Sequence, residues 1–523
     1  PRQVLDAIGT AICTAPRREA VEADLQLALA QPFAHADMVN LIQSSHASAP
    51  GLTGAGYQLL KLLPEAATRK LFHLMHFLWR TEKRIPRLWK YKGLHGIPKP
   101  AIPHIRSAAD LRPIGLIEVT RKLWTKLVLS RITRALHHHQ VLQPQHCGGL
   151  GGRGTDTAML QTLNMLEHMQ EDWQEGADPT DREVHLDFMS WDTKKAFDSV
   201  GNHVQYLAWR RAGIPSDTAT WLLRLDLGGR FVALTPYANI VLKAAEAGPP
   251  SARYAAMDRI GTKHERGLTQ GDVKSPLGWI LVFDILLTAL NQCLPDLYPK
   301  APVAGLHCYP LLPLAYLDDL TSLTCFRHHT QELADLVSGF NLVMGMQFAA
   351  HKFRASSTHA DPTPVIVHDR EWNPTEVTLT PASERSTVLG IPFALDYKWD
   401  EQGRRTQEKV RGIAKLLRPS KASPLTKATV LVASTLEAMT YVTSLSAWPT
   451  PVLRHLRSTV SQLLREVLGL GPTYPTHLLY CTVGGMGLTD IVTAALKSRA
   501  RILTRCLHGP WPASGAARGL LER

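Results

Sequence analysis

Two adjacent aspartates, Asp318 and Asp319, interrupt an apolar stretch that covers residues 311–324. Apolar residues on both sides of the pair are the pattern of two short strands joined by a tight turn. Neighbouring anions between apolar strands repel each other and lose hydration, so they need a compensating cation, and hard divalent ions prefer oxygen ligands. Taken alone, such a pair is more often an ordinary turn in solvent. Two further stretches of the chain, near Asp192 and near Gln270, favour a cation site over a solvent-exposed turn.

A third carboxylate comes at the end of a predicted strand. Residues 184–191 favour a strand that ends close to Asp192, which is a usual place for a metal-binding carboxylate. Asp187 is an odd number of residues from Asp192, so we expect it to face the other side of the strand and to be structural. Asp198 and Ser199 then favour the N-terminal cap of the following helix.

Glycines flank a glutamine ahead of a long apolar helix. Gly267 and Gly271 bracket Gln270, so the backbone and an amide can approach a flat ligand closely. Ser275 and Pro276 suit a helix start, with the proline inside the first turn. A capped core helix would explain the Ser-Pro pair but not the glycine-flanked segment before it.

Two basic residues upstream are candidates for phosphate contacts. The proline after Arg112 forces an extended backbone, from which a guanidinium can fork onto phosphate oxygens, and Lys99 could add a second positive charge. From this segment alone, a surface arginine in a turn is the favoured interpretation. The glycine-rich residues 147–155 lack the Gly-Lys-Ser/Thr ending of a phosphate loop, so we interpret them as a flexible backbone that lets another chain approach closely.

Composition sets the broad class. The chain has 523 residues, which is enough for two or more domains. At 45% hydrophobic and 20% charged residues, its composition is that of a globular protein. Its net charge of +13 suggests nucleic acid as the partner, although simple solubility would also explain it. The seven cysteines show no metal-binding spacing and fit a reducing compartment, so we expect a nuclear or cytoplasmic location. No signal peptide is visible, and the apolar residues 276–290 are too short to span a bilayer. The first residue is Pro1, so we expect a fragment of something longer.

Coarse patterns place the remaining elements. Helices are expected at residues 18–30, 57–79, 118–139, 156–174 and 331–348, a looser connection at 228–262, a short hairpin at 388–393 and mainly helix at 423–469. Residues 401–421 are basic and suit a solvated helix face that could follow a phosphate backbone.

In this order, these segments resemble the reverse transcriptases of non-LTR (LINE-like) retrotransposons and, more distantly, those of group II introns. The similarity runs from about residue 49 to residue 472. Residues 192–200, 267–276 and 315–319 match the first three palm motifs, 345–352 and 389–392 resemble the fourth and fifth, and 97–99, 111–116 and 145–149 resemble the fingers motifs. Leu317 stands where many relatives have alanine.

The resemblance implies an α+β fold of the right-hand polymerase type, with fingers, an antiparallel palm sheet and a helical thumb. The implied division is an N-terminal helical extension at 1–48, fingers at 49–180, palm at 181–394 with interleaved fingers segments, thumb at 395–472 and a C-terminal tail at 473–523.

The resemblance also assigns roles to single residues. Asp192, Asp318 and Asp319 would be catalytic and would bind two Mg²⁺ ions, with Mn²⁺ as an alternative. Phe197 would be a steric gate that rejects the 2′-hydroxyl. The other substrate contacts would be Arg112 and Lys99 to the triphosphate, Gln270 and Gly271 to nucleotide and template, and Lys352 to the pyrophosphate side.

The implied activity is an RNA-directed DNA polymerase that extends a primer on an RNA template by two-metal nucleotidyl transfer. Its partners would be an RNA template, a DNA or RNA primer and dNTPs, with no membrane, and an endonuclease would come from a missing segment or another protein. An RNA-dependent RNA polymerase is disfavoured by Phe197 and by the Gln-Gly-Asp of the second motif. A catalytically silent RNA-binding scaffold is disfavoured because all three aspartates persist.

Overall fold

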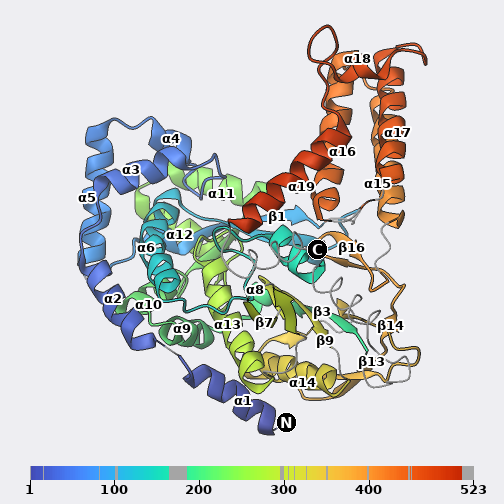
Figure 1. The fold of residues 1–523 in the computed structure, drawn as a ribbon. Helices are drawn as coiled ribbons and strands as arrows, with labels where there is room; N and C mark the ends of the chain where they lie inside the picture. The colour runs from blue at the N-terminus through green and yellow to red at the C-terminus, as the bar shows by residue number, and fades with distance from the viewer. Residues whose placement is uncertain are drawn as a thin grey trace.

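The structure is a computed structural model of a mixed α+β protein, in which a body of helices and sheets carries a set of projecting helices (Figure 1). It describes residues 2–15, 17–81, 83–99, 104–163, 185–294, 300–303, 306–310, 313–324, 327–348, 352–396, 400–445, 448 and 450–508.

The N-terminal part of the body is helical. α6 is buried along most of its length, and α2 and α3 pack against it. Helices predicted at 18–30 and 118–139 are confirmed, whereas the helix predicted at 57–79 is divided into two, 57–61 and 65–80. A helix also covers residues 155–163 at the start of the predicted 156–174 segment. The bounds are α1 Arg2–Cys13, α2 Arg18–Ala30, α3 His35–Ser44, α4 Tyr57–Lys61, α5 Glu65–Arg80 and α6 Val119–His138.

A four-stranded sheet follows, in the order β2-β1-β4-β5. Its strands are β1 Tyr91–Pro98, β2 Leu111–Leu116, β4 Arg230–Ala233 and β5 Thr262–Lys263, with the short 3-10 helices Arg87–Lys90 and Ala108–Asp110 before β1 and β2. The antiparallel β1–β2 pair places Arg112 opposite Ile97 on an extended backbone, as the following proline predicted.

The prediction of a loose connection at 228–262 is wrong. Two helices, α11 Pro236–Glu246 and α12 Pro250–Ile260, lie between β4 and β5. Both prolines occupy the first helical turn, where a missing N–H costs nothing, so they start helices rather than break them. The two helices bury Leu242 and Met257 with Tyr91 and Val232 of the sheet in a small second core.

The second sheet lies at the centre of the body, in the order β14-β11-β3-β9-β8, and β10 also pairs with β3. α14 packs against β9 and β10, α13 packs against α14, and α9 packs against α13, and these helices contribute to the main core. The strands are β3 Asp187–Lys194, β8 Leu314–Tyr316, β9 Asp319–Thr324, β10 Gln347–Phe348, β11 Arg354–Ser357 and β14 Thr380–Pro381. The helices are α8 Ala196–Ser199, α9 Asn202–Arg211, α10 Ser216–Arg224, α13 Ser275–Cys293 and α14 Arg327–Val343.

α13 begins at Ser275 with Pro276 in its first turn, as predicted. The prediction that this apolar stretch is too short to span a bilayer is wrong, because α13 has 19 residues and is long and apolar enough to cross a membrane by length and composition. Of an 18-residue stretch of this helix, 78% is buried inside the protein. Burial of this kind is the ordinary state of a core helix, so α13 is weak evidence for a membrane span.

Among the described residues, the remaining strands form short two-stranded pairs: β6 Lys300–Val303 with β7 Leu306–Pro310, β12 Val365–His368 with β13 Pro374–Val377, and β15 Ser386–Val388 with β16 Ile391–Phe393. The last of them confirms the hairpin predicted at 388–393.

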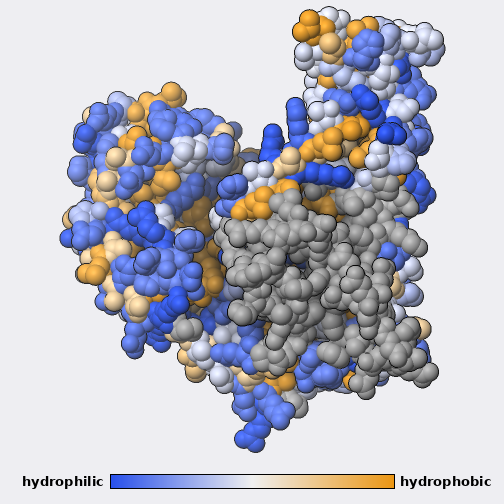
Figure 2. Space-filling view, in the orientation of Figure 1, coloured by the Kyte–Doolittle hydropathy of each residue, from blue (hydrophilic) through white to orange (hydrophobic). Residues whose placement is uncertain are grey.

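The C-terminal helices project from the body, and α18 lies at their far end (Figure 1). α19 returns along α16, and Arg505 at its end forms an ion pair with Asp156 of the body. The space-filling view shows an open cleft between the N-terminal part of the body and the projecting helices (Figure 2). The bounds are α15 Asp400–Leu417, α16 Pro424–Leu445, α17 Thr450–Leu468, α18 Thr476–Tyr480 and α19 Ile491–Leu507.

Candidate active site

The three predicted metal-binding aspartates lie together at one end of the central sheet. Asp192 near the end of β3 is the direct register partner of Asp319, the first residue of β9. Asp318 lies in the turn between β8 and β9. Residues directly opposite in an antiparallel pair have Cβ atoms roughly 4.5–5.5 Å apart, so the fold brings together carboxylates that are far apart in sequence.

The turn that carries Asp318 is built against the glycine-rich segment. Leu317 takes a left-handed backbone conformation with φ +56°. A Cβ on Gly148 would lie 2.7 Å from the Leu317 backbone nitrogen, so only glycine fits there. The Cys147 N–H donates to the Ala315 carbonyl at 2.8 Å. The close approach predicted for residues 147–155 is therefore present, and the segment that approaches belongs to this same chain.

Burial and mutual repulsion disfavour the charged forms of the two neighbouring aspartates. The Asp319 side chain is accessible to solvent at the surface, yet the surrounding protein displaces enough water to raise its pKa, and the charges of Asp318 and Asp192 raise it further, to about 6. Burial, and then Asp192, also raise the pKa of Asp318. The site thus holds more negative charge than its surroundings compensate.

Two predicted cations act on this site. The Lys352 Nζ lies 2.8 Å from the Asp192 Oδ2, and its side chain is still 55% exposed. Arg112 on β2 is close enough for its charge to oppose the rise in the pKa of Asp318. Lys99 lies beside Asp110, whose backbone carbonyl accepts from the Lys99 N–H at 3.0 Å. Its contact with a triphosphate stays a prediction.

The aspartates offer a donor set that fits a hard divalent ion. Three carboxylates supply only oxygen ligands, and their uncompensated charge favours a cation. Within the described part of the chain, no three His, Cys, Asp or Glu side chains already form a group that could hold a metal ion. The chemistry of the donors fits, and the assignment of Asp192, Asp318 and Asp319 as metal ligands stays a prediction.

Asp187 is structural in this fold. It is fully buried, accepts a hydrogen bond from the Thr330 hydroxyl at 2.8 Å and lies 3.3 Å from Arg327, both at the start of α14. Asp192 instead contacts Lys352. The prediction that the two aspartates face opposite sides of β3 is confirmed.

Phe197 lies on the short helix α8, where its ring stacks on Trp279 at a centroid distance of 5.3 Å. The prediction that Asp198 and Ser199 cap the next helix is wrong. α8 ends at Ser199, and Gly201 occupies the N-cap position of α9. The Ser199 hydroxyl donates back to the Ala196 carbonyl, which removes it from capping.

The Gln270 segment lies between α8 and β2. The Gln270 carbonyl accepts from the Gly115 N–H at 2.7 Å, and a Cβ on Gly271, which has φ +100°, would lie 2.7 Å from the Gly115 carbonyl oxygen. On its other side, the Leu268 N–H donates to the Phe197 carbonyl at 2.7 Å. The predicted nucleotide contacts of the second motif are therefore packed directly against Phe197 and the strand that carries Arg112.

The sequence analysis missed a set of buried charged side chains next to this segment, which we name the buried charge cluster. All are at most 8% exposed: Lys92, Arg121, Asp226, His264, Asp272 and Lys274. Other basic residues adjoin Lys92 and Arg121 in the sequence, so neither of them stands out as a buried cation. No local pattern connects residues that are spread over more than 180 positions.

Comparison with known proteins identifies one family. Residues 97–393, more than half of the chain, match the family model described as reverse transcriptase (RNA-dependent DNA polymerase). A Drosophila melanogaster protein described as a probable RNA-directed DNA polymerase from transposon BS is 25% identical over 184 residues. That match covers 35% of this chain and 19% of the relative, so the chain spans about a fifth of the relative's length.

Proposed function

The chain belongs to the reverse transcriptase (RNA-dependent DNA polymerase) family, and from this premise we propose that it extends a primer on an RNA template with deoxynucleotides. The observation that carries the proposal is the register of Asp192 against Asp319, with Asp318 in the adjoining turn, inside the matched residues. A non-LTR retrotransposon is the proposed source, supported by the transposon protein that the chain resembles.

The three aspartates would hold the divalent cations, and we propose Mg²⁺. If bound there, such cations would activate the primer 3′-hydroxyl and stabilise charge on the leaving pyrophosphate. The β3–β9 pairing places two of the carboxylates opposite each other before substrate arrives. Lys352, exposed and beside Asp192, is placed to give positive charge to the pyrophosphate side.

Substrate selection would come from the residues around Gln270. Arg112 would contact the triphosphate, and Gln270 and Gly271 the nucleotide and template. Phe197 would exclude the 2′-hydroxyl, because its ring is held against Trp279 and its backbone against the Gln270 segment, so it cannot easily move away.

We propose the right-hand division of the chain on the same basis, with residues 49–180 as fingers, 181–394 as palm and 395–472 as thumb. The open cleft between the N-terminal part of the body and the projecting helices supports it (Figure 2), as does the exposed basic face of α15. Endonuclease activity would come from another segment or another protein, and a nuclear or cytoplasmic location remains part of the proposal.

Primer extension on an RNA template tests the function. The purified protein is given Mg²⁺ and a labelled primer, with dNTPs and rNTPs in separate reactions, and Asp318→Ala serves as the inactive control. Extension with dNTPs alone, lost on chelation of the metal, is the expected result. Extension with rNTPs alone would assign an RNA polymerase. Tight RNA binding without extension would assign a scaffold.

A further inference from the structure

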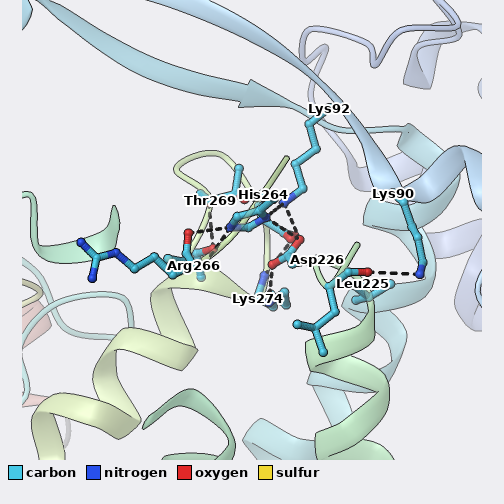
Figure 3. Close-up of polar contacts among 12 residues, drawn as sticks. Lys90, Lys92, Leu225, Asp226, His264, Arg266, Thr269 and Lys274 are labelled. Atoms are coloured by element: carbon cyan, nitrogen blue, oxygen red, sulfur yellow. Dashed lines mark hydrogen bonds and ion pairs between the residues drawn. The ribbon is translucent and has the colours of Figure 1, made fainter. Parts of the chain in front are cut away.

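The buried charge cluster lies beside the Gln270 segment, and the side chains of Lys92, Asp226, His264 and Lys274 point toward one another there (Figure 3). Its side chains come from β1, α6, the loop between α10 and β4, and the segment from β5 to α13: Lys92, Arg121, Asp226, His264, Asp272 and Lys274. None of the roles assigned above uses these residues.

Asp226 is the anion that the three cations of the cluster share. Its Oδ1 lies 2.5 Å from the Lys92 Nζ and 2.8 Å from the Arg121 Nη2, and its Oδ2 lies 2.7 Å from the Lys274 Nζ. Burial alone would raise the pKa of Asp226, but Lys274, Lys92 and Arg121 hold it well below its usual range. One ionised carboxylate therefore ties together three elements that are distant in sequence.

Lys92 connects this carboxylate to the Gln270 segment. Besides Asp226, its Nζ donates to the Thr269 hydroxyl at 2.6 Å and contacts the His264 Nδ1 at 2.8 Å. The His264 Nε2 lies 2.8 Å from the Arg266 carbonyl oxygen, which can only accept, so Nε2 carries the proton and Nδ1 accepts from Lys92. Both ends of the segment 264–269 are thus held by one ammonium group.

Thr269 connects the Lys92 ammonium group to Gln270, one of the proposed nucleotide contacts. The Ser275 hydroxyl donates to the Thr269 carbonyl at 2.8 Å, and the next carbonyl, that of Gln270, accepts from Gly115. The Thr269 methyl group also packs against Gly115, where a Cβ would not fit. A displacement of Thr269 would therefore displace Gln270.

The cluster has no clear advantage for stability. It buries three cations against two carboxylates, and an apolar cluster of equal volume often stabilises a fold as well or better. Directional hydrogen bonds fix the positions of the groups that they join, whereas apolar packing does not.

We propose that the buried charge cluster positions the nucleotide-contacting segment, with Asp226 and Lys92 as positioning residues that act through Thr269 on Gln270. This inference rests on the proposed function. It differs from that function in assigning nucleotide affinity to residues that touch neither nucleotide nor metal.

Thr269 gives the cleanest test, because Asp226→Asn would leave buried cations without their acceptor and could prevent folding. Thr269→Val keeps the side-chain volume but removes the hydroxyl that Lys92 needs, whereas Thr269→Ser keeps the hydroxyl and removes the methyl group. Thr218→Val is the matched control, since the Thr218 hydroxyl is also buried and accepts from a lysine, Lys83, at 2.8 Å. The measurements are KM and kcat for dNTPs, and Kd for the template–primer.

We expect Thr269→Val to raise the dNTP KM by at least about fivefold, roughly the worth of one hydrogen bond. The template–primer Kd should not change, and Thr269→Ser and Thr218→Val should stay near the wild type. An impaired Thr269→Ser with a normal Thr269→Val would assign packing instead of positioning. An equal KM rise in Thr218→Val would assign general destabilisation. Either result overturns the inference while the wild type still extends primers, and a wild type that does not extend them overturns the proposed function as well.

Discussion

Asp192 and Asp319 face each other directly across β3 and β9, so the fold places two carboxylates at a pair of positions where like charges destabilise a sheet. We predict that Asp319→Asn abolishes primer extension and yet raises the melting temperature of the metal-free protein, by roughly 1–3 °C, because it removes this repulsion. Thermal denaturation in the presence of a chelator measures the effect.

Asp258→Asn is the control for this prediction. Asp258 accepts from the Tyr91 hydroxyl and pairs with Arg87, each at 2.8 Å, so its charge is compensated. Its loss should lower the melting temperature or leave it unchanged. A lower melting temperature for Asp319→Asn would mean that favourable contacts stabilise the Asp319 carboxylate in the metal-free protein, which would argue against its assignment as a metal ligand.

The stacking of Phe197 on Trp279 leads to a second prediction, which concerns the sugar selectivity of the enzyme. Phe197→Ala should raise the use of rNTPs relative to dNTPs by at least about tenfold, because the missing ring opens space for the 2′-hydroxyl. Competition between the two nucleotide types in single-nucleotide extension measures the ratio. Phe283→Leu, which replaces another ring stacked on Trp279 with an aliphatic side chain, should leave the ratio unchanged. Equal ratios for both variants would remove Phe197 from the role of steric gate.

Local patterns were enough to predict the parts of the site that short segments encode. The turn at Asp318, the start of α13 at Ser275 and the hairpin near residue 390 each depend on neighbours within a few residues. The odd spacing between Asp187 and Asp192 was enough to predict that they face opposite sides of β3, since side chains alternate along any strand.

Features that depend on tertiary contacts could not be predicted in this way. The helices α11 and α12 form because they cover Tyr91 and Val232 of the first sheet, which the residues 228–262 do not reveal. The buried charge cluster depends on Asp226 meeting Lys92, more than 130 positions earlier in the sequence. Ser199 was expected to cap a helix, but its hydroxyl satisfied a nearer carbonyl.

His264 gives a prediction about acid stability. Burial, and then the charge of Lys92, lower its pKa from 6.5 to about 4. Between these values the unfolded chain binds a proton that the folded protein does not. The contribution of His264 is therefore complete above pH 6.5 and is lost as the pH falls toward 4, by about 3 kcal/mol in total.

His264→Gln should remove this part of the pH dependence. We expect the free energy of unfolding of the wild type to fall more steeply than that of the variant between pH 6.5 and pH 4.5, as measured by urea denaturation at fixed pH steps. The exposed His203 provides the control, and His203→Gln should follow the wild type. Parallel curves for the wild type and His264→Gln would show that the imidazole becomes protonated in the folded protein without cost.

The basic face of α15 gives the last prediction, about nucleic-acid affinity. Arg411 and Lys415 lie one helical turn apart and are both exposed. If each neutralises one phosphate of the template–primer, then Arg411→Gln with Lys415→Gln should weaken binding and reduce the slope of log K against log salt by about 2. The kcat at saturating template–primer should not change, because neither residue lies among the proposed catalytic groups. Lys61→Gln with Lys70→Gln makes the same change in net charge on α4 and α5. An equal loss of slope in this control pair would mean that the protein's overall charge, and not the face of α15, attracts the nucleic acid.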